Sequence, residues 1–286
     1  MPKLIYLMKR EEKRLELVEK TIQDIKDVKI QGANNIAING IKAATLTDDK
    51  KILYRIANAR PTEPLLQNSI EIISNSKHPL NKANKLTKYL EDSRGKIAYI
   101  GSKLIKNDMN VFSHCHSSTV MDILKYAKKF RKINFTVYTL EVEPLLQGRK
   151  TAEELSKYGI NVIVFPDLAA EAALKKCEVF LFGADAYVKK GIVNKIGTEL
   201  LCKVAQDYRL PAYSCGVSLK YTKKVKIESR SGREVWDERN KRITIVNPAF
   251  DFTNRKYVTG VISELGILDY KSFVKKAKKT KDNLSK

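Results

Sequence analysis

Two short clusters in this chain combine residue types that can move protons and bind anions. The first, Gly183-Ala184-Asp185, directly follows the apolar run at residues 179–182. Such a run predicts a buried strand, and an acid after a strand lies at the sheet edge where open α/β sheets bind ligands. Nine residues on, Asn194 and Lys195 precede a predicted helix, whose first N–H groups favour anions. This loop therefore predicts a site for a phosphorylated ligand.

The second cluster, Ser113-His114-Cys115-His116-Ser117-Ser118-Thr119, comes just before another predicted helix. A thiol at a helix N-terminus gains thiolate character from the dipole and from nearby cations, and hydroxyl and N–H groups there can hold a phosphate. Two alternatives are a metal site at His-Cys-His and a buried cysteine beside capping hydroxyls. No third ligand cluster is apparent, so we expect no metal.

Together the clusters predict a proton-transfer pair. Partial burial behind an apolar strand raises the pKa of Asp185, so a thiolate base at Cys115 could act with a protonated acid at Asp185. Taken alone, Asp185 could instead cap a helix, and Lys195 and Lys220 could be ordinary surface lysines. Arg60, between a helix end and a proline, is better placed for bidentate phosphate binding.

The elements that must position these residues change in type along the chain. Helical periodicity dominates the first part, and from about residue 110 short apolar strands alternate with helices, which predicts a doubly wound parallel sheet. We expect an α/β protein with an N-terminal helical domain (1–106, including a linking helix) and a Rossmann-like domain (107–286) that ends in a basic tail, frayed over 273–286. Helices are expected at 4–27, 36–44, 51–59, 65–74, 81–90, 96–106, 118–130, 151–158, 168–175 and 196–208, and strands at 110–113, 134–140, 161–165, 178–182, 212–215 and 242–246.

Composition narrows the function classes. The 286 residues, 43% of them hydrophobic, suffice for one large or two modest domains. No apolar run approaches the roughly 20 residues of a membrane span, and no secretory pattern or zinc-ribbon cysteine spacing is present. We therefore expect a cytoplasmic protein without a membrane partner. The net charge of +22 is spread along the chain without interleaved aromatic residues, so we expect an anionic small substrate rather than nucleic acid.

The clusters resemble one superfamily when taken with Arg60-Pro61-Thr62, Gln147-Gly148, Gly191, the segment 194–198 and Asn247-Pro248-Ala249-Phe250-Asp251. It contains the regulatory subunits of translation initiation factor 2B, methylthioribose-1-phosphate isomerase and archaeal ribose-1,5-bisphosphate isomerase. The likeness runs from about residue 20 to residue 267, and His-Cys-His-Ser and the chain length resemble the ribose-1,5-bisphosphate isomerases most.

This resemblance implies conversion of ribose 1,5-bisphosphate to ribulose 1,5-bisphosphate in nucleotide salvage, without a cofactor, with AMP as activator and with assembly into dimers or hexamers. Asp185 would assist ring opening, and Cys115 would abstract the proton beside the nascent carbonyl. The residues implied to bind sugar and phosphates are Gln31, Gly32, Ala33, Asn34, Arg60, Ser117, Ser118, Thr119, Asn194, Lys195 and Lys220.

Three departures from the family pattern leave a second hypothesis open. Gln31 stands where the family has arginine, and Ser118 where lysine is common. The family's Glu-Thr-Arg-Pro is Glu141-Val142-Glu143-Pro144 here, so Glu143 replaces an arginine and reverses a charge at the expected crevice. Because a bisphosphate carries about four negative charges, lost cations also fit a non-catalytic regulatory protein that binds initiation factor 2. The enzyme hypothesis predicts Cys115 and Asp185 facing one closed, cationic pocket, whereas the regulatory one predicts an open or partly filled pocket.

Overall fold

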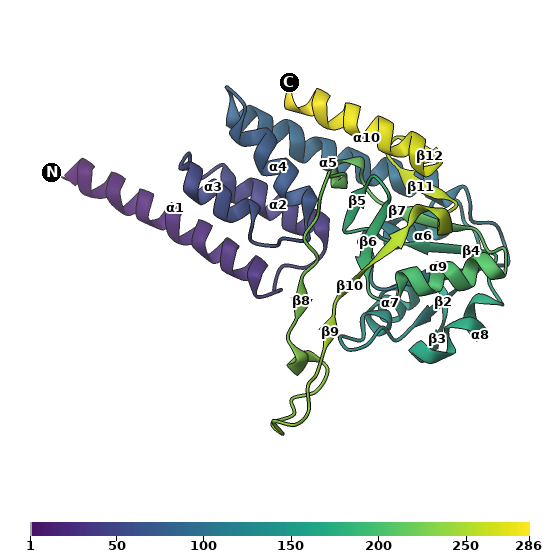
Figure 1. Ribbon diagram of the computed structural model, residues 1–286. Helices are drawn as coiled ribbons and strands as arrows, with labels where there is room; N and C mark the ends of the chain where they lie inside the picture. The colour runs from purple at the N-terminus through teal and green to yellow at the C-terminus, as the bar shows by residue number, and fades with distance from the viewer. Residues whose placement is uncertain (1) are drawn as a thin grey trace.

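The computed structural model describes residues 2–286, with side chains from residue 11 onward. Five helices form the N-terminal part (Figure 1): α1 (Pro2–Lys26), α2 (Ala33–Ala44), α3 (Lys50–Ala57), α4 (Pro64–Ser74) and α5 (Pro79–Ser102). The two helices expected at 81–90 and 96–106 are one helix, α5. Gly95 does not break it, because a mid-helix glycine costs only about 1 kcal/mol and Leu86, Leu90 and Ile97 bury a continuous face.

A seven-stranded sheet follows, in the order β12-β11-β7-β4-β1-β2-β3. All neighbours pair in parallel except β11 and β12. The strands are β1 (Met109–His114), β2 (Phe135–Leu140), β3 (Asn161–Phe165), β4 (Val179–Phe182), β7 (Ala212–Cys215), β11 (Gly260–Ser263) and β12 (Gly266–Leu268). The helices of this part are α6 (Ser118–Lys129), α7 (Gln147–Ser156), α8 (Ala170–Leu174), α9 (Thr198–Asp207) and α10 (Tyr270–Ser285). The expected α/β fold with a doubly wound, mostly parallel sheet is confirmed.

Apolar side chains cover both faces of this sheet. Val111 belongs to a core cluster with residues of α5 and α6, and its neighbour Phe112 to another with residues of α9 and α10. A third cluster lies among α1 to α4. Burial on both faces is typical of parallel sheets.

The order of the strands reverses between β1 and β4. From β1 the chain continues outward through β2 and β3, whereas β4, β7 and β11 lie on the other side of β1. His114 at the end of β1 pairs with Phe182 at the end of β4. The segments that begin at Cys115 and Gly183 therefore leave the sheet side by side, at the switch point where open α/β sheets bind ligands.

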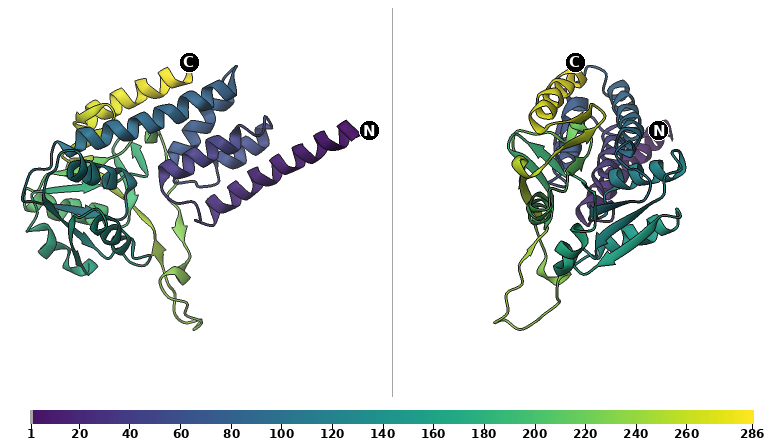
Figure 2. Two further views of the ribbon diagram at one scale, coloured as in Figure 1. Left: turned by 180° about the vertical axis from the view of Figure 1, so that it is seen from behind. Right: turned by 90° about the vertical axis from the view of Figure 1, so that its right-hand side faces the viewer.

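Residues 186–195 form a hairpin rather than the expected loop. Its strands, β5 (Ala186–Val188) and β6 (Gly191–Lys195), join β10 (Phe250–Asn254) in a small antiparallel sheet. A two-stranded ribbon, formed by β8 (Ser229–Arg230) and β9 (Asn247–Pro248), carries residues 231–246, which we call the arm. The arm projects from the body of the protein in Figures 1 and 2. Four single 3₁₀ turns complete the fold: η1 (Asp167–Ala169), η2 (Ser218–Lys220), η3 (Gly232–Glu234) and η4 (Arg255–Tyr257).

The strand expected at 242–246 is wrong. These residues lie in the arm without strand structure, and Val246 is 76% exposed. Their alternating apolar pattern therefore has no sheet to face, and the last parallel strand is β11, whose Val261 and Ile262 are buried. The helix expected at 168–175 is shorter, as η1 and α8, and the one expected at 151–158 begins earlier, as α7.

The frayed tail expected at 273–286 is also wrong, because these residues belong to α10. Phe273, Val274 and Ala277 are buried along one face, while most of the lysines lie on the other. Lys281 donates hydrogen bonds to Asn68 of α4 at 2.7 Å and to Glu71 at 2.8 Å. Both views in Figure 2 show α10 running beside α5. Within residues 2–286 no helix is both long and apolar enough to cross a membrane.

Candidate active site

A cavity of about 210 Å³ lies at the carboxyl ends of β1 and β4, where the turns before α2 and α4 close it. It brings together residues that are far apart in the sequence. The residues expected at the site that line it are Gln31, Gly32, Ala33, Arg60, Cys115, Ser117, Ser118, Thr119, Asp185, Asn194, Lys195 and Lys220. Both clusters of the sequence thus contribute to one cavity, together with two turns of the helical part.

Two expectations about individual positions differ from the structure. Asn34 does not line the cavity, whereas its neighbour Asn35 does; both lie in the first turn of α2, where successive residues point about 100° apart. Glu143 is exposed and is not part of the lining. Its backbone N–H donates to Asp167 at 2.8 Å. The acid expected to oppose a phosphate in the crevice is therefore outside it.

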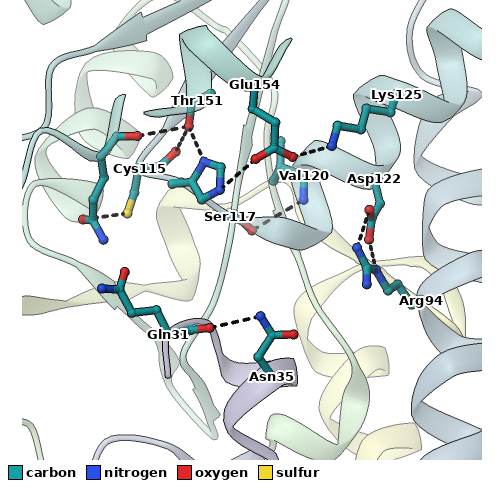
Figure 3. Close-up of polar contacts among 12 residues, drawn as sticks. Gln31, Asn35, Arg94, Cys115, Ser117, Val120, Asp122, Lys125, Thr151 and Glu154 are labelled. Atoms are coloured by element: carbon teal, nitrogen blue, oxygen red, sulfur yellow. Dashed lines mark hydrogen bonds and ion pairs between the residues drawn. The ribbon is translucent and has the colours of Figure 1, made fainter. Parts of the chain in front are cut away.

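Cys115 occupies a strained turn between β1 and α6. Its φ of +66° is a left-handed conformation that residues other than glycine rarely adopt. Thr151 of α7 holds this turn: its hydroxyl donates to the carbonyl oxygen of Cys115 at 3.3 Å and lies 3.0 Å from Nδ1 of His116. The thiol of Cys115 donates to Oε1 of Gln147 at 3.2 Å. Figure 3 shows these contacts, which fix the sulfur at the cavity wall.

The protonation state of Cys115 differs from the one expected from the sequence. Burial raises the pKa of the thiol to about 12, and Lys195 lowers it by less than burial raises it. The negative charge of Asp185 raises it further. Without a ligand, Cys115 is a neutral thiol, because the loss of hydration outweighs the nearby cation and the helix N-terminus.

Asp185 faces the same cavity from the connection between β4 and β5. Its backbone N–H donates to the carbonyl of Val193 at 2.9 Å, which ties it to the β5–β6 hairpin. Burial raises its pKa to about 6, while Lys220 and Arg60 lower it. The two clusters are in close contact, because a Cβ atom on Gly183 would lie 2.7 Å from Oγ of Ser117. Glycine at this position lets the end of β4 approach the cap of α6.

Lys195 and Lys220 are buried lysines of the lining, not the surface lysines that were the alternative. Lys220 lies in η2 and donates to the carbonyl of Ala184 at 2.5 Å. Burial lowers its pKa, and the charges of Asp185 and Glu63 raise it. The side-chain amide of Asn68 in α4 donates to the carbonyls of Leu219 and Tyr221, at 2.6 and 3.0 Å. The helical part of the chain thereby fixes the turn that carries Lys220.

Sequence reasoning missed five polar residues of the lining: Asn35, Glu63, Gln147, Lys150 and Arg230. Glu63 sits in the Arg60-Pro61-Thr62-Glu63-Pro64 turn, which reads as a simple helix end, and Lys150 follows the motif Gln147-Gly148. Both residues are close in sequence to residues or motifs already singled out, and this proximity could have indicated that they belong to the site. Arg230 precedes the arm, and no sequence signal places it beside the other residues.

Both histidines of the Cys115 segment are neutral in this environment. Burial lowers the pKa of His114 to about 4, and its Nε2 lies 3.0 Å from the carbonyl of Ile196. A neutral ring can donate to a carbonyl only through its N–H, so Nε2 carries the proton. Burial also lowers the pKa of His116, whose Nε2 lies 3.3 Å from Glu154. Among the described residues, no group of three or more His, Cys, Asp or Glu side chains could hold a metal.

The charges of the lining favour an anionic ligand. Arg60, Lys150, Lys195, Lys220 and Arg230 face two acids, Glu63 and Asp185, so the formal charge of the lining is +3. Ser117 caps α6 by accepting from the backbone of Val120, which leaves the hydroxyls of Ser118 and Thr119 at the helix N-terminus. Lysine, arginine and a helix N-terminus are the usual partners of phosphate groups.

Comparisons with known proteins agree with this geometry. The chain is 29% identical to ribose 1,5-bisphosphate isomerase of Methanocaldococcus jannaschii, with 89% of this chain and 92% of that one covered. It is 31% identical to methylthioribose-1-phosphate isomerase of Thermoanaerobacter sp., with 89% and 88% covered. The crystal structure of translation initiation factor eIF-2B from Pyrococcus horikoshii superposes with a TM-score of 0.79 at 28% identity, covering 88% of this chain and 96% of that one. Residues 42–270 match the model of the initiation factor 2 subunit family. Because this match spans well over half of the sequence, the chain belongs to the initiation factor 2 subunit family.

Proposed function

We propose that this chain is an aldose–ketose isomerase acting on a phosphorylated pentose, with ribose 1,5-bisphosphate converted to ribulose 1,5-bisphosphate as its reaction in nucleotide salvage. The observation that carries this proposal is the shared cavity: Cys115 and Asp185 line it from the adjoining ends of β1 and β4, among five cations. Relatives with isomerase names cover nearly the whole chain, which supports a sugar-phosphate isomerase.

In the proposed reaction, Asp185 donates a proton to the ring oxygen as the bond between this oxygen and C1 breaks, which leaves C1 as an oxocarbenium stabilised by its phosphate oxygen. The thiolate of Cys115 takes the proton from C2, and an enol forms between C1 and C2. The thiol of Cys115 then returns this proton to C1 while the C2 hydroxyl gives its proton to the carboxylate of Asp185, so the C2 ketone forms and both residues are regenerated without an external reductant or cofactor. Burial already raises the pKa of Asp185 to about 6, which suits a proton donor near neutral pH. Lys195 and Lys220 would stabilise the negative oxygen of the intermediate.

The lining holds two cations that were not expected from the sequence. Gln31, Ser118 and Glu143 leave up to three cations fewer than the family pattern, but Lys150 and Arg230 line the cavity, and Glu143 lies outside it. We assign phosphate binding to these two residues with Lys195 and the N-terminus of α6, whereas Arg60 pairs with Glu228 at 3.0 Å. Gln31, Gly32, Ala33 and Asn194 would contact the sugar.

One observation favours the alternative, a non-catalytic regulatory protein that binds initiation factor 2. The reaction needs Cys115 as thiolate and Asp185 as acid, whereas the pKa of Cys115 is raised to about 12 and that of Asp185 to about 6. At neutral pH the two side chains therefore have the reverse protonation states: Cys115 is a thiol and Asp185 a carboxylate. In an enzyme, Cys115 must lose its proton and Asp185 must gain one when the substrate binds. A regulatory protein would bind a sugar phosphate or nucleotide without turnover.

We also infer a homo-oligomer, a dimer or hexamer, that acts in the cytoplasm, where its four free cysteines stay reduced. Support for assembly comes from the arm, where Trp236 is 54% and Val246 76% exposed. Both residues lie in the same projecting segment, and contiguous exposed apolar surface marks interaction sites. No cofactor is assigned, and AMP is proposed as an activator.

The test is direct. Purified protein is incubated with ribose 1,5-bisphosphate, with and without AMP, and the loss of ribose and gain of ribulose signals are followed by NMR. We expect turnover that disappears in Cys115→Ser and in Asp185→Asn while circular dichroism and oligomer mass stay unchanged. Equal turnover in Cys115→Ser would remove the thiol from the mechanism. A folded wild-type protein without turnover would support the regulatory alternative.

A further inference from the structure

Glu63 occupies a helix-capping position but does not cap. It is the residue before α4, where a short polar side chain such as aspartate or serine usually accepts a hydrogen bond from the first turn of the helix. Its side chain makes no such bond. Instead the residue is 3% exposed and lines the cavity, and its Oε2 is buried without a hydrogen-bond partner. A local structural role therefore does not explain this acid.

The charged groups around Glu63 come from four separate segments. Arg60 lies in its own turn, Asp185 after β4, Lys220 in η2 and Glu228 just before β8. Arg60 is already paired with Glu228 at 3.0 Å, and Lys220 donates to the carbonyl of Ala184. Among residues 11–286, no cation lies within 4.0 Å of the Glu63 carboxylate. Each of these two cations therefore has another partner, although Nε of Arg60 is buried without one.

Burial and the charge of Asp185 raise the pKa of Glu63 to about 8, although Lys220 and Arg60 lower it. At neutral pH its side chain is therefore mostly a carboxylic acid, which carries an O–H donor as well as acceptors. A buried donor without a partner is costly unless a ligand supplies an acceptor. Around Glu63 the cations Arg60 and Lys220 are balanced by the acids Asp185 and Glu228, so this end of the cavity has no excess positive charge for a phosphate group.

We infer that Glu63 is a further ligand-contacting residue of this site, which donates a hydrogen bond to a hydroxyl of the bound sugar and so orients the pentose with its phosphates away from α4. The inference rests on the proposed function, because it assumes a phosphorylated sugar in this cavity. The two kinds of group on the ligand then lie at opposite ends of the cavity. The sugar hydroxyl lies against Glu63 and Asp185, and the phosphates lie against Lys150, Lys195 and the start of α6.

The test measures binding, which does not require turnover. Isothermal titration calorimetry is run with ribose 1,5-bisphosphate, ribose 1-phosphate, ribose 5-phosphate and methylthioribose 1-phosphate, and the tightest ligand is kept. Wild type is compared with Glu63→Gln, which keeps a donor but cannot ionise, and with Glu63→Leu, which has none. Glu71→Gln is the matched control, because Glu71 is an exposed glutamate of α4, outside the cavity, and pairs with Lys281 at the surface. Thermal unfolding of each variant checks the fold.

At pH 7 we expect Glu63→Gln to bind within about 3-fold of wild type and Glu63→Leu about 10-fold more weakly, which is the usual effect of losing one hydrogen bond in a buried site. Between pH 7 and 9.5 the affinity of wild type should fall about 10-fold while that of Glu63→Gln changes less. Lys220 titrates in both proteins, and the phosphates are already dianionic, so the difference isolates Glu63.

Equal affinities in wild type and Glu63→Leu at pH 7 would overturn the inference, and so would equal pH dependence in wild type and Glu63→Gln. Tight binding without turnover, with the expected effects of the Glu63 variants, would refute the isomerase and leave the role of Glu63 standing. Failure of every sugar phosphate to bind the wild-type protein would overturn both.

Discussion

Gly148→Ala tests how closely α7 must approach β2 for the site to form. A Cβ atom on Gly148 would lie 1.6 Å from the carbonyl oxygen of Leu140 and 3.1 Å from that of Glu141. Both are backbone atoms, and the N–H of Gly148 donates to the Glu141 carbonyl at 2.9 Å. To reach a contact distance of 3.0 Å from 1.6 Å, the start of α7 must move by about 1.4 Å. No side-chain rotation can relieve this clash.

The displaced turn carries Gln147, which accepts the hydrogen bond of the Cys115 thiol, and leads to Thr151, which holds the Cys115 turn. A misplacement of 1 Å near a reacting group can cost about 100-fold in rate, so we expect kcat/KM for the sugar phosphate to fall by about that factor. Overpacking should lower the free energy of unfolding by about 1–3 kcal/mol, measured by urea denaturation.

Gly95→Ala is the matched control. Gly95 lies in α5, and a Cβ atom there would meet no atom within 4 Å. Alanine should therefore stabilise the protein by about 0.5–1 kcal/mol and leave kcat/KM unchanged. If Gly148→Ala matches wild type in both rate and stability, then α7 is not held against β2 as described. The assigned support of Cys115 would then be refuted.

Three further predictions concern protonation, reactivity and assembly. The pKa of Glu63 is raised from 4.5 to about 8, so the folded state binds an extra proton between these values. The free energy of unfolding of wild type relative to Glu63→Gln, measured with urea at each pH, should therefore fall between pH 5 and 8 and then level off, by at most about 4 kcal/mol at 1.4 kcal/mol per pKa unit. A difference that stays constant with pH would contradict this prediction. Burial raises the pKa of Cys115 to about 12, so iodoacetamide at pH 7.5 should alkylate this thiol at least about 100-fold more slowly than a free thiol. Rapid modification, followed by mass spectrometry, would mean that Cys115 is a thiolate. Trp236→Ser should shift the mass measured by light scattering toward smaller species, and an unchanged assembly would exclude the arm as the contact.

The fold class was predictable from the sequence because its signals are local. The run at residues 179–182 and the similar runs at 161–165 and 212–215 are short, apolar and separated by helical periodicity, and each became a strand of the sheet. The segment at 242–246 has a comparable pattern but no neighbouring strand. Strand formation there depends on a partner, which the local pattern does not specify.

Most of the candidate site was predictable for a different reason. Residues that follow strands of a parallel sheet share one edge, so Cys115 and Asp185 could be placed together without coordinates. The charge state of Cys115 could not be predicted, because burial depends on packing from the helical part. Glu63 and Arg230 come from turns whose approach to the cavity is set by tertiary contacts alone.

The packing of α10 has a consequence for the order in which the protein matures. Lys281 in α10 contacts Asn68, and Asn68 holds the turn that carries Lys220. Every residue that lines the cavity precedes α10 in the chain. During synthesis, which adds roughly 5–20 residues per second, the ribosome therefore releases all the residues that line the cavity before the helix that braces it. A nascent chain halted ahead of α10 should carry all the chemical groups of the site and yet bind its sugar phosphate poorly.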